Sequence, residues 1–402
     1  MKLLYVTWDS PQVAYLEGLF LPILERLRDF DFRFDVLQFT WGDRDRIEAS
    51  ASACAGAGIG YRAARVRRGW GGAGPLLTAW RGGRHIFHQV RASEAHAVLA
   101  RSTMPALSML CAARRGSVPF AFDADGLPLD ERIDFAERNP AGLTHRVLRD
   151  VEAQAARRAA AVLVRTSVAR DIMIARAGAG CDPARFFVVT NGRDPSIFAP
   201  LSPEERSIVR RSIDIPDEAL LLGYAGSLGP QYRYEEMLLL LRMLRERGTD
   251  ARLLMITPEP HAALDLARAT APDMLANCVS FRAEPNGVAR WMSACDIGLG
   301  LRTSSFSMQA VAPIKLAEYL LCGLPVVGTS GIGDTKIAEE SGVFFPVRNS
   351  NHLDLAAACE WIFHVTRDGG APGRARTVGM TQFSIDTAVR SYAAALSGLR
   401  NV

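Results

Sequence analysis

Lysine is nearly absent from this chain of 402 residues. Of its 47 basic residues, only Lys2, Lys315 and Lys336 are lysines and the other 44 are arginines, set against 43 acidic residues. The formal net charge of +4 is too small to indicate a nucleic-acid partner, for which a concentrated basic footprint is expected. In a chain so rich in arginine a single arginine carries little information, whereas a lysine inside a motif is informative.

Long apolar runs and paired cysteines are also missing. No apolar run reaches the roughly 18–20 residues that span a bilayer, and the N-terminal MKLLYVTWDS lacks the cleavage site of a signal peptide. The seven cysteines form no CxxC pair, which favours reduced thiols over a disulfide or zinc framework. His85, His88 and His96 do not form an HExxH pattern, so no metal site is predicted. We therefore expect a cytoplasmic protein.

What the chain does contain is a repeated alternation of short apolar runs and amphipathic helical patterns. This alternation is typical of a mostly parallel, doubly wound α/β sheet. It restarts at 219–227, after a segment at 191–205 with three prolines and an Asn-Gly turn. We expect two Rossmann-like domains facing a cleft, 1–198 and 199–382, with the C-terminal helix of 383–402 packing back on the first.

The motif PIKLAEYLLCGLPVV at 313–327 is the most informative in the second half. Pro313 suits the first turn of a helix, and Lys315 and Glu318, three residues apart, lie on one side of it. The preceding loop directs backbone N–H groups and a helix N-terminus towards the expected cleft, which predicts an anion site. From the residues alone, an ordinary surface Lys–Glu pair is an equally good interpretation.

A second motif, GYAGSLGPQYRYEEM at 223–237, ends a predicted strand in small residues. Gly226 and Ser227 allow a ligand to approach the backbone closely. Arg233 follows a Gly-Pro turn at the start of the next helix, and arginine is a bidentate partner for phosphate. The alternative is a solvated arginine, which is common in a chain of this composition.

With these two motifs, the chain resembles the retaining glycosyltransferases of family four, which have the GT-B fold. The resemblance is carried by segments in a fixed order along nearly the whole chain: YLEGLFLPILERL, ARST, FDADGLPLDER, VVTNGRDPSIF, GYAGSLG, PIKLAEYLLCGLPVV and GIGDT. It implies the GT-B fold and transfer of a sugar from a nucleoside-diphosphate sugar, here a UDP-sugar, to a hydroxyl with retention.

The resemblance places the donor in the second domain. Glu318 matches the glutamate that holds the ribose, whereas the family's other glutamate falls on Ala310 and is missing. The family's two basic residues that bind the diphosphate fall on Ser227 and Arg233, and only Arg233 is basic here. Lys315 supplies the positive charge that is missing at Ser227. The resemblance assigns donor binding to these residues: Gly226, Ser227, Arg233, Ala310, Ala312, Ile314, Lys315 and Glu318.

The first domain departs further from the family pattern. TWDSPQ at 7–12 replaces the usual Gly-Gly acceptor loop, and the family histidine falls within Asp123-Ala124-Asp125. We expect these residues on the acceptor side: Asp9, Ser10, Gln12, Arg101, Asp123 and Asp125. Among them, Asp125 is expected to orient the acceptor, with an amino sugar or aminocyclitol as one suitable class.

The implied mechanism needs neither a metal nor a cofactor. Negative charge develops on the departing β-phosphate, and preorganised donors in a water-poor site stabilise such charge strongly. We expect Arg233 and Lys315 to provide this stabilisation and Asp125 to act on the acceptor. The departing phosphate oxygen would take the acceptor's proton on the same face of the sugar.

Several alternatives remain open at this stage. The stretch 62–85 combines arginines with Trp70 and Trp80, and either docks peripherally on an anionic inner membrane face with a lipid-linked acceptor or is a mobile, solvated loop. The loop is favoured because the glycines oppose a continuous helix.

In place of a transferase acting on a small molecule or glycan, the chain could be a nucleotide-sugar 2-epimerase or a non-catalytic nucleotide-sugar-binding partner. The oligomeric state is not predicted.

Overall fold

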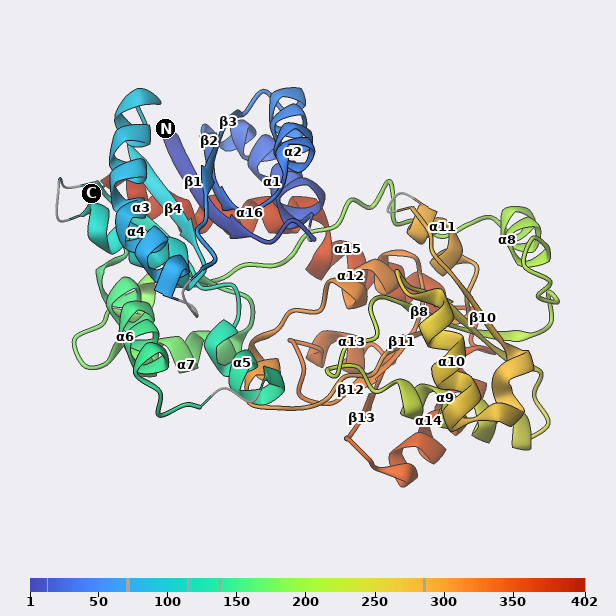
Figure 1. Ribbon diagram of the computed structural model, residues 1–402. Helices are drawn as coiled ribbons and strands as arrows, with labels where there is room; N and C mark the ends of the chain where they lie inside the picture. Colours follow the sequence, from blue (N-terminus) through green and yellow to red (C-terminus); the bar gives the residue numbers. More distant parts are fainter. Residues whose placement is uncertain are drawn as a thin grey trace. The chain divides into compact units, whose positions relative to one another are not determined.

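The chain folds into two compact units. The computed structural model describes residues 1–12, 14–69, 73–113, 116, 118–136, 139–284 and 287–401. The first unit comprises Met1–Gly192, Gln309–Ala312 and Ile385–Val402, and the second comprises Arg193–Met308 and Pro313–Ser384. Figure 1 shows the course of the chain through both units.

A parallel sheet of seven strands forms the centre of the first unit. The strand order is β3-β2-β1-β4-β5-β6-β7, and every neighbouring pair is parallel. The strands are β1 (Lys2–Asp9), β2 (Arg33–Thr40), β3 (Gly60–Arg65), β4 (Ala97–Arg101), β5 (Phe120–Asp123), β6 (Ala161–Val164) and β7 (Phe186–Val188). The order reverses between β1 and β4, and in such sheets ligands bind beyond the carboxyl ends of the strands at this point.

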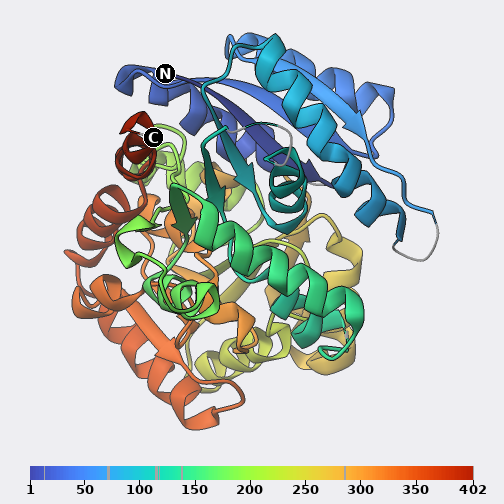
Figure 2. The same ribbon diagram turned by 90° about the vertical axis from the view of Figure 1, so that its left-hand side faces the viewer.

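Helices cover both faces of this sheet, with α3, α4 and α6 on one face and α1 and α16 on the other (Figures 1 and 2). The helical segments are η1 (Leu16–Phe20), α1 (Leu21–Arg26), η2 (Leu27–Phe30), α2 (Arg44–Gly56), α3 (Ala73–Ala92), α4 (Thr103–Ala112), α5 (Pro128–Ala136), α6 (Leu143–Arg158), α7 (Ser167–Ala177), η3 (Pro183–Arg185), α16 (Ile385–Ser397) and η7 (Gly398–Asn401). Fully buried side chains such as Val6, Phe39 and Val98 fill the core between sheet and helices.

The structure corrects the expectation for the glycine-rich stretch 62–85. Residues 73–85 form the first part of α3, so the interpretation as a mobile loop is wrong for them. Gly82 and Gly83 are buried where α3 meets α4, and a Cβ atom at Gly83 would lie 2.8 Å from the backbone nitrogen of Ala112. The glycines therefore permit close helix packing. Trp70, in the same stretch, lies outside the described residues.

The second unit is built on a parallel sheet of six strands in the order β10-β9-β8-β11-β12-β13. The strands are β8 (Leu220–Ala225), β9 (Ala251–Ile256), β10 (Cys278–Phe281), β11 (Ile297–Gly300), β12 (Val326–Thr329) and β13 (Phe344–Val347). Its helices are α8 (Pro203–Arg211), α9 (Tyr234–Glu246), α10 (Pro260–Thr270), η4 (Pro272–Asn277), α11 (Val288–Ser293), α12 (Ile314–Leu321), α13 (Lys336–Glu340), α14 (His352–Val365) and α15 (Ala371–Phe383), and a short turn η6 (Ser307–Ala310) precedes α12. The predicted fold class, two Rossmann-like parallel-sheet domains, is confirmed.

The limits of the two units differ from the expected 1–198 and 199–382. The chain passes from the first unit to the second after Gly192, because Phe198 is already buried in the core of the second unit. Residues 309–312 belong to the first unit, as does everything from Ile385 onwards. There α16 packs against α1, with the Arg26 guanidinium 2.9 Å from the Asp386 carboxylate.

No helix in the described part of the chain is long and apolar enough to cross a membrane.

Candidate functional site

In the second unit, a pocket lies at the carboxyl ends of three neighbouring strands. It is lined by Tyr224 at the end of β8, Arg302 just after β11 and Thr329 at the end of β12, together with Tyr232, Lys315 and Phe344. Short buried strands bring these side chains together, because the carboxyl ends of parallel strands meet at one edge of the sheet.

Lys315, on the first turn of α12, extends its ammonium group over two aromatic rings. Its Nζ lies 4.5 Å from the centre of the Tyr232 ring, 5.5 Å from that of Tyr224 and 3.4 Å from the Tyr232 hydroxyl. Within the described residues no carboxylate lies within ion-pair distance of this Nζ. Burial lowers the pKa of the Lys315 ammonium, and nearby Arg302 acts in the same direction. Lys315 is therefore a partly buried cation whose neighbours are rings and a hydroxyl.

Arg302 is a second cation of this pocket, and sequence reasoning missed it. Its guanidinium lies over the Tyr232 ring at 5.0 Å. Its backbone is held at both polar groups, because the amide donates to Thr329 Oγ1 and the carbonyl accepts from it, each at 2.7 Å. Among the described residues no ion pair neutralises Arg302. The signal that could have found it is its position within two residues of the end of a buried strand.

The phenol of Tyr232 shows the effect of these two cations. Burial alone would raise its pKa, but Lys315 and Arg302 bring the pKa below its ordinary value. A lowered phenol pKa means that the anionic form is favoured at this point. The pocket is therefore electropositive, as a site for a phosphate group must be.

Gly226 leaves room for the Lys315 side chain. Its φ is 154°, and a Cβ atom at this position would lie 2.1 Å from Lys315 Nζ. The carbonyl of Ser227 accepts a hydrogen bond from the Tyr224 hydroxyl, which fixes the loop after β8. Gly226 and Ser227 are thus placed beside Lys315, as the motif indicated.

Glu318, one turn along α12 from Lys315, is engaged by a residue that the sequence did not single out. The Nη2 atom of Arg193 lies 2.9 Å from Glu318 Oε1, and the Glu318 side chain is only 12% exposed. Burial raises the pKa of the Glu318 carboxyl, whereas Arg193 and Lys315 act to lower it. Ile314, the first residue of α12, is half-buried beside this turn.

Three predicted donor residues lie elsewhere. The Arg233 guanidinium contacts the Glu236 carboxylate and donates to Ser350 Oγ at 2.8 Å, at the start of α9. Ala310 is fully buried in the core of the first unit. The carbonyl of Ala312 accepts from Asn191 Nδ2 at 3.2 Å, also in the first unit. None of the three lines the pocket.

In the first unit, the predicted acceptor-side residues gather in a buried network of charges. Asp9 ends β1, Arg101 ends β4 and Asp123 ends β5, so neighbouring strands bring them together. Arg101 lies 3.4 Å from the Asp9 carboxylate, contacts Asp125 and rests over the Phe20 ring at 4.4 Å. Asp125 is the most exposed member, at 28%, against 8% for Arg101.

Arg165, directly after β6, completes this network and was missed by the sequence analysis. Its Nη2 lies 2.8 Å from Asp123 Oδ2 and 3.6 Å from Asp125 Oδ1, and Arg165 and Asp123 are almost completely buried. The hydroxyl of Tyr392 on α16 also contacts this network, at 3.5 Å from Asp123 Oδ2. Burial raises the pKa of Asp125 even though Arg101 and Arg165 act to lower it.

Backbone strain gathers at the same edge of the sheet. Ser102 has a φ of 73° and Asp125 a φ of 49°, both in the left-handed region that side chains other than glycine seldom adopt. The Ser102 amide donates to the Asp123 carbonyl at 2.7 Å, which holds the turn in place. Such strained residues often mark functional sites.

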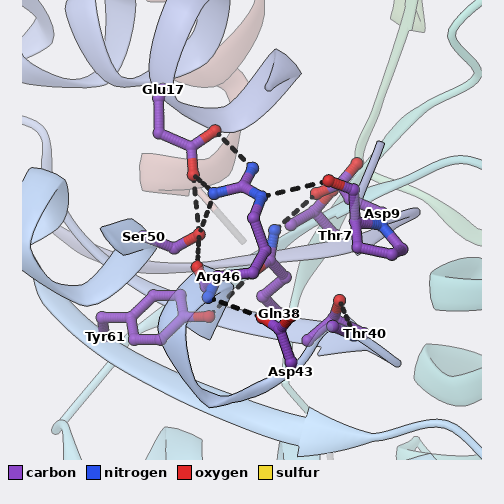
Figure 3. A network of polar contacts seen from close by, with 11 residues as sticks. Thr7, Asp9, Glu17, Gln38, Thr40, Asp43, Arg46, Ser50 and Tyr61 are labelled. Atoms are coloured by element: carbon purple, nitrogen blue, oxygen red, sulfur yellow. Dashed lines mark hydrogen bonds and ion pairs between the residues drawn. The ribbon is translucent and has the colours of Figure 1, made fainter. Parts of the chain in front are cut away.

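A polar network extends from Asp9 across the ends of β1–β3, as Figure 3 shows. The Asp9 carboxylate accepts from Thr7 at 2.8 Å and from Gln38 at 3.0 Å, and Gln38 accepts from Tyr61. Beyond it, the Glu17 carboxylate on the π-helical turn η1 accepts from both Nη atoms of Arg46, at 2.7 and 3.0 Å, and from the Ser50 hydroxyl at 2.6 Å. The predicted residues Ser10 and Gln12 lie in the loop after β1, where the Ser10 hydroxyl donates to Gln12 Oε1. This part of the first unit is therefore held by hydrogen bonds from several elements.

Metal ligands do not assemble in the part of the chain that the structure describes, where no group of three histidine, cysteine or acidic side chains could hold an ion.

Comparison with known families finds a match for each unit. Residues 20–192 match the family described as "Glycosyl transferase 4-like domain", and residues 219–364 match "Glycosyl transferases group 1". The two matches together cover most of the chain.

Curated relatives match parts of the chain. The D-inositol 3-phosphate glycosyltransferase of Stackebrandtia nassauensis is 27% identical over 280 residues, 66% of this chain and 58% of that protein. TuaH of Bacillus subtilis is 27% identical over 202 residues, 48% of this chain and 46% of that protein. The chain thus spans about half the length of these relatives.

Solved structures resemble the whole chain. HepE of Anabaena, in complex with UDP, is similar with a TM-score of 0.76 and 16% identity, covering 99% of this chain and 100% of that one. A glycosyltransferase of Rickettsia africae gives a TM-score of 0.73 and 13% identity, with each chain covered completely. At these identities the similarity shows the fold.

Proposed function

The chain belongs to the glycosyltransferases of the GT-B type. We propose that it transfers a sugar from a UDP-sugar to a hydroxyl of a small-molecule or glycan acceptor. In this proposal the configuration at the anomeric carbon is retained. The observation that carries this proposal is the pair of cations in the pocket of the second unit. Lys315 and Arg302 face a tyrosine-lined pocket without a carboxylate partner among the described residues.

A diphosphate suits this pocket on physical grounds. A partly buried cation without a counter-ion pays a desolvation cost that a bound anion recovers. The compact Lys315 ammonium and the planar Arg302 guanidinium offer separate N–H donors, and hydrogen bonds between charged partners are the strongest in proteins. In this proposal they bind the diphosphate and stabilise the charge that develops on the β-phosphate as the sugar departs. Arg302 takes the role that the sequence analysis gave to Arg233.

Glu318 is proposed to accept hydrogen bonds from the ribose hydroxyls, on the side of α12 that also carries Lys315. UDP is chosen as the nucleotide because structures of Anabaena HepE with the same fold are described with UDP and with UDP-glucose. The carboxyl edge of the first unit supplies the acceptor side, with Asp125 as its most exposed carboxylate. Metal independence belongs to the proposal, since Lys315 and Arg302 supply the positive charge.

Incubation of the full chain with a panel of nucleotide sugars tests this proposal. With UDP-sugars and no acceptor, we expect slow hydrolysis to UDP and the free sugar, whose configuration at C2 is unchanged. This hydrolysis should persist when a chelator removes divalent metal ions. Asp125→Asn should raise the acceptor KM once an acceptor is found, without changing the affinity for UDP. Release of the C2 epimer would instead identify an epimerase, and binding without turnover would identify a non-catalytic nucleotide-sugar-binding protein.

A further inference from the structure

Arg193 lies where the chain enters the second unit and contacts α12, the helix that also carries Lys315 of the pocket. It is the first residue of the second unit, and its amide donates to the Phe383 carbonyl at 2.9 Å. It also pairs with Ser384 as an isolated β-bridge, next to the point where the chain leaves the unit at Ile385. The backbone of Arg193 is therefore fixed between the two passages of the chain.

The side chain of Arg193 is directed by packing towards α12. Its guanidinium carbon lies 4.7 Å from the centre of the Phe198 ring, and its Nη2 lies 2.9 Å from Glu318 Oε1. A guanidinium held on an aromatic face loses little further freedom when it binds a carboxylate. The pair therefore fixes the orientation of the Glu318 side chain before any ligand arrives.

Glu318 needs such a partner. A buried carboxyl without a neighbouring cation becomes protonated, because burial disfavours the charged form. A protonated carboxyl accepts weaker hydrogen bonds than a carboxylate does. Lys315 also lowers the pKa of Glu318, but Arg193 is the stronger of the two influences. A diphosphate bound to Lys315 would offset the charge of the lysine, leaving Arg193 as the partner of Glu318.

We propose that Arg193 is a positioning residue for ribose recognition, which orients the Glu318 carboxylate so that it accepts the hydroxyls of a bound nucleotide. The inference rests on the proposed function, since it takes Glu318 as the ribose acceptor. It goes beyond that function by making discrimination between ribose and deoxyribose depend on a residue at the start of the second unit. Arg193 itself need not touch the nucleotide.

The test compares the affinities of the full chain for UDP and for 2′,3′-dideoxyuridine diphosphate by calorimetry between pH 6 and 8. In the unsubstituted protein UDP should bind about tenfold or more tighter, because each lost hydroxyl removes a hydrogen bond to a charged group. Arg193→Gln should reduce this preference to within about threefold, since an unoriented and partly protonated Glu318 accepts poorly. The remaining preference should fall further as the pH is lowered, because loss of the cation raises the pKa of Glu318.

Arg376 provides the matched control. Its guanidinium donates to the carbonyls of Pro195, Phe198 and Leu321 in the same region, without contacting Glu318. Arg376→Gln should lower stability and leave the ribose preference unchanged. If Arg193→Gln does not fold, Arg193→Lys carries the test, with a reduced preference because a single ammonium does not orient the Glu318 carboxylate as the planar guanidinium does.

The outcomes separate the two proposals. If Arg193→Gln or Arg193→Lys keeps the full preference at every pH while UDP binds, the positioning role is overturned and the proposed function stands. A titration of the unsubstituted chain with uridine tests the proposed function separately: if UDP binds less than about threefold tighter than uridine, the proposed function fails, whatever the Arg193 variants show. A preference lost equally in the Arg193 and Arg376 variants would assign the effect to general damage of this region and also overturn the inference.

Discussion

The two units treat their charged residues in opposite ways at the carboxyl edges of their sheets. In the first unit Arg101 and Arg165 each contact aspartates, and three acidic groups share two guanidiniums. In the second unit Lys315 and Arg302 face tyrosine rings, and no carboxylate of the described chain lies within ion-pair distance. The first edge is thus internally neutralised with an acidic excess, and the second is electropositive.

This difference indicates what each edge can bind. Buried arginines that are already paired hold loops in place, and they offer little attraction to a phosphate. Cations without a counter-ion retain their full attraction for an anion. On the proposed function, we therefore expect the diphosphate in the second unit and an uncharged or amine-bearing acceptor at the first, where Asp125 is the most exposed carboxylate of the network.

The largest expected effect concerns stability in the first unit. Asp123→Asn removes the partner of the buried Arg165 and should cost about 3–5 kcal/mol in the free energy of unfolding, because it leaves a buried charge uncompensated. Denaturant unfolding of the full chain measures this cost. Asp171→Asn, which breaks an exposed pair with Arg170, should cost about 1 kcal/mol or less. Equal costs for the two variants would contradict the structural role of the first-unit network.

The second prediction concerns the affinity of the second unit. Lys315→Met should weaken UDP binding by about tenfold to a hundredfold, the loss expected for one hydrogen bond between charged partners. Lys336→Met is the control, because Lys336 is 86% exposed and lies near Glu340 on α13. Titration calorimetry compares the two variants. Similar losses in both would show that Lys315 has no special role.

A smaller effect follows from the lowered pKa of Lys315. Its charged form is already disfavoured in the free protein, so the ammonium loses its proton at a lower pH than an ordinary lysine. A bound diphosphate favours the charged form, and UDP affinity should therefore weaken as the pH rises through this lowered pKa, which a series of titrations towards alkaline pH measures. Lys315→Arg should bind UDP more weakly at pH 7.5, because the broader guanidinium does not fit the corner beside Gly226.

The arginine variant also serves as the control for titration of the uracil ring of UDP, because that titration affects binding to both proteins. Since arginine stays charged over this range, its affinity should change less with pH than that of the unsubstituted chain. Parallel pH profiles for the two proteins would contradict the assignment of the titration to Lys315.

The sequence could predict the residues whose neighbours in the chain are also their neighbours in space. Lys315 and Glu318 share a helix face, and Gly226 ends a strand, so local spacing was enough to place them in the second unit. Arg302 and Arg165 were missed because their partners come from other strands, and nothing local distinguishes them in an arginine-rich chain. Both lie within two residues of the end of a buried strand, which is the signal that sequence reasoning could have used.

The predicted donor residues that lie outside this pocket do so for equally physical reasons. Arg233 was expected on a phosphate, but Glu236, three residues on along α9, contacts its guanidinium. Ala310 was expected in the donor loop, but the chain returns briefly to the first unit at 309–312 and buries the methyl group in that core. The second unit begins at Arg193 rather than at the expected residue 199, because the proline-rich segment already packs in that unit through Phe198.

The central claim is that the pocket of Lys315 and Arg302 binds the diphosphate of a nucleotide. Titration of the full chain with UDP and with uridine at pH 7.5 and low salt tests it most directly. The account predicts that UDP binds at least about a hundredfold tighter than uridine, since two cations contribute hydrogen bonds between charged partners. Affinities for UDP and uridine within about threefold of each other would contradict it.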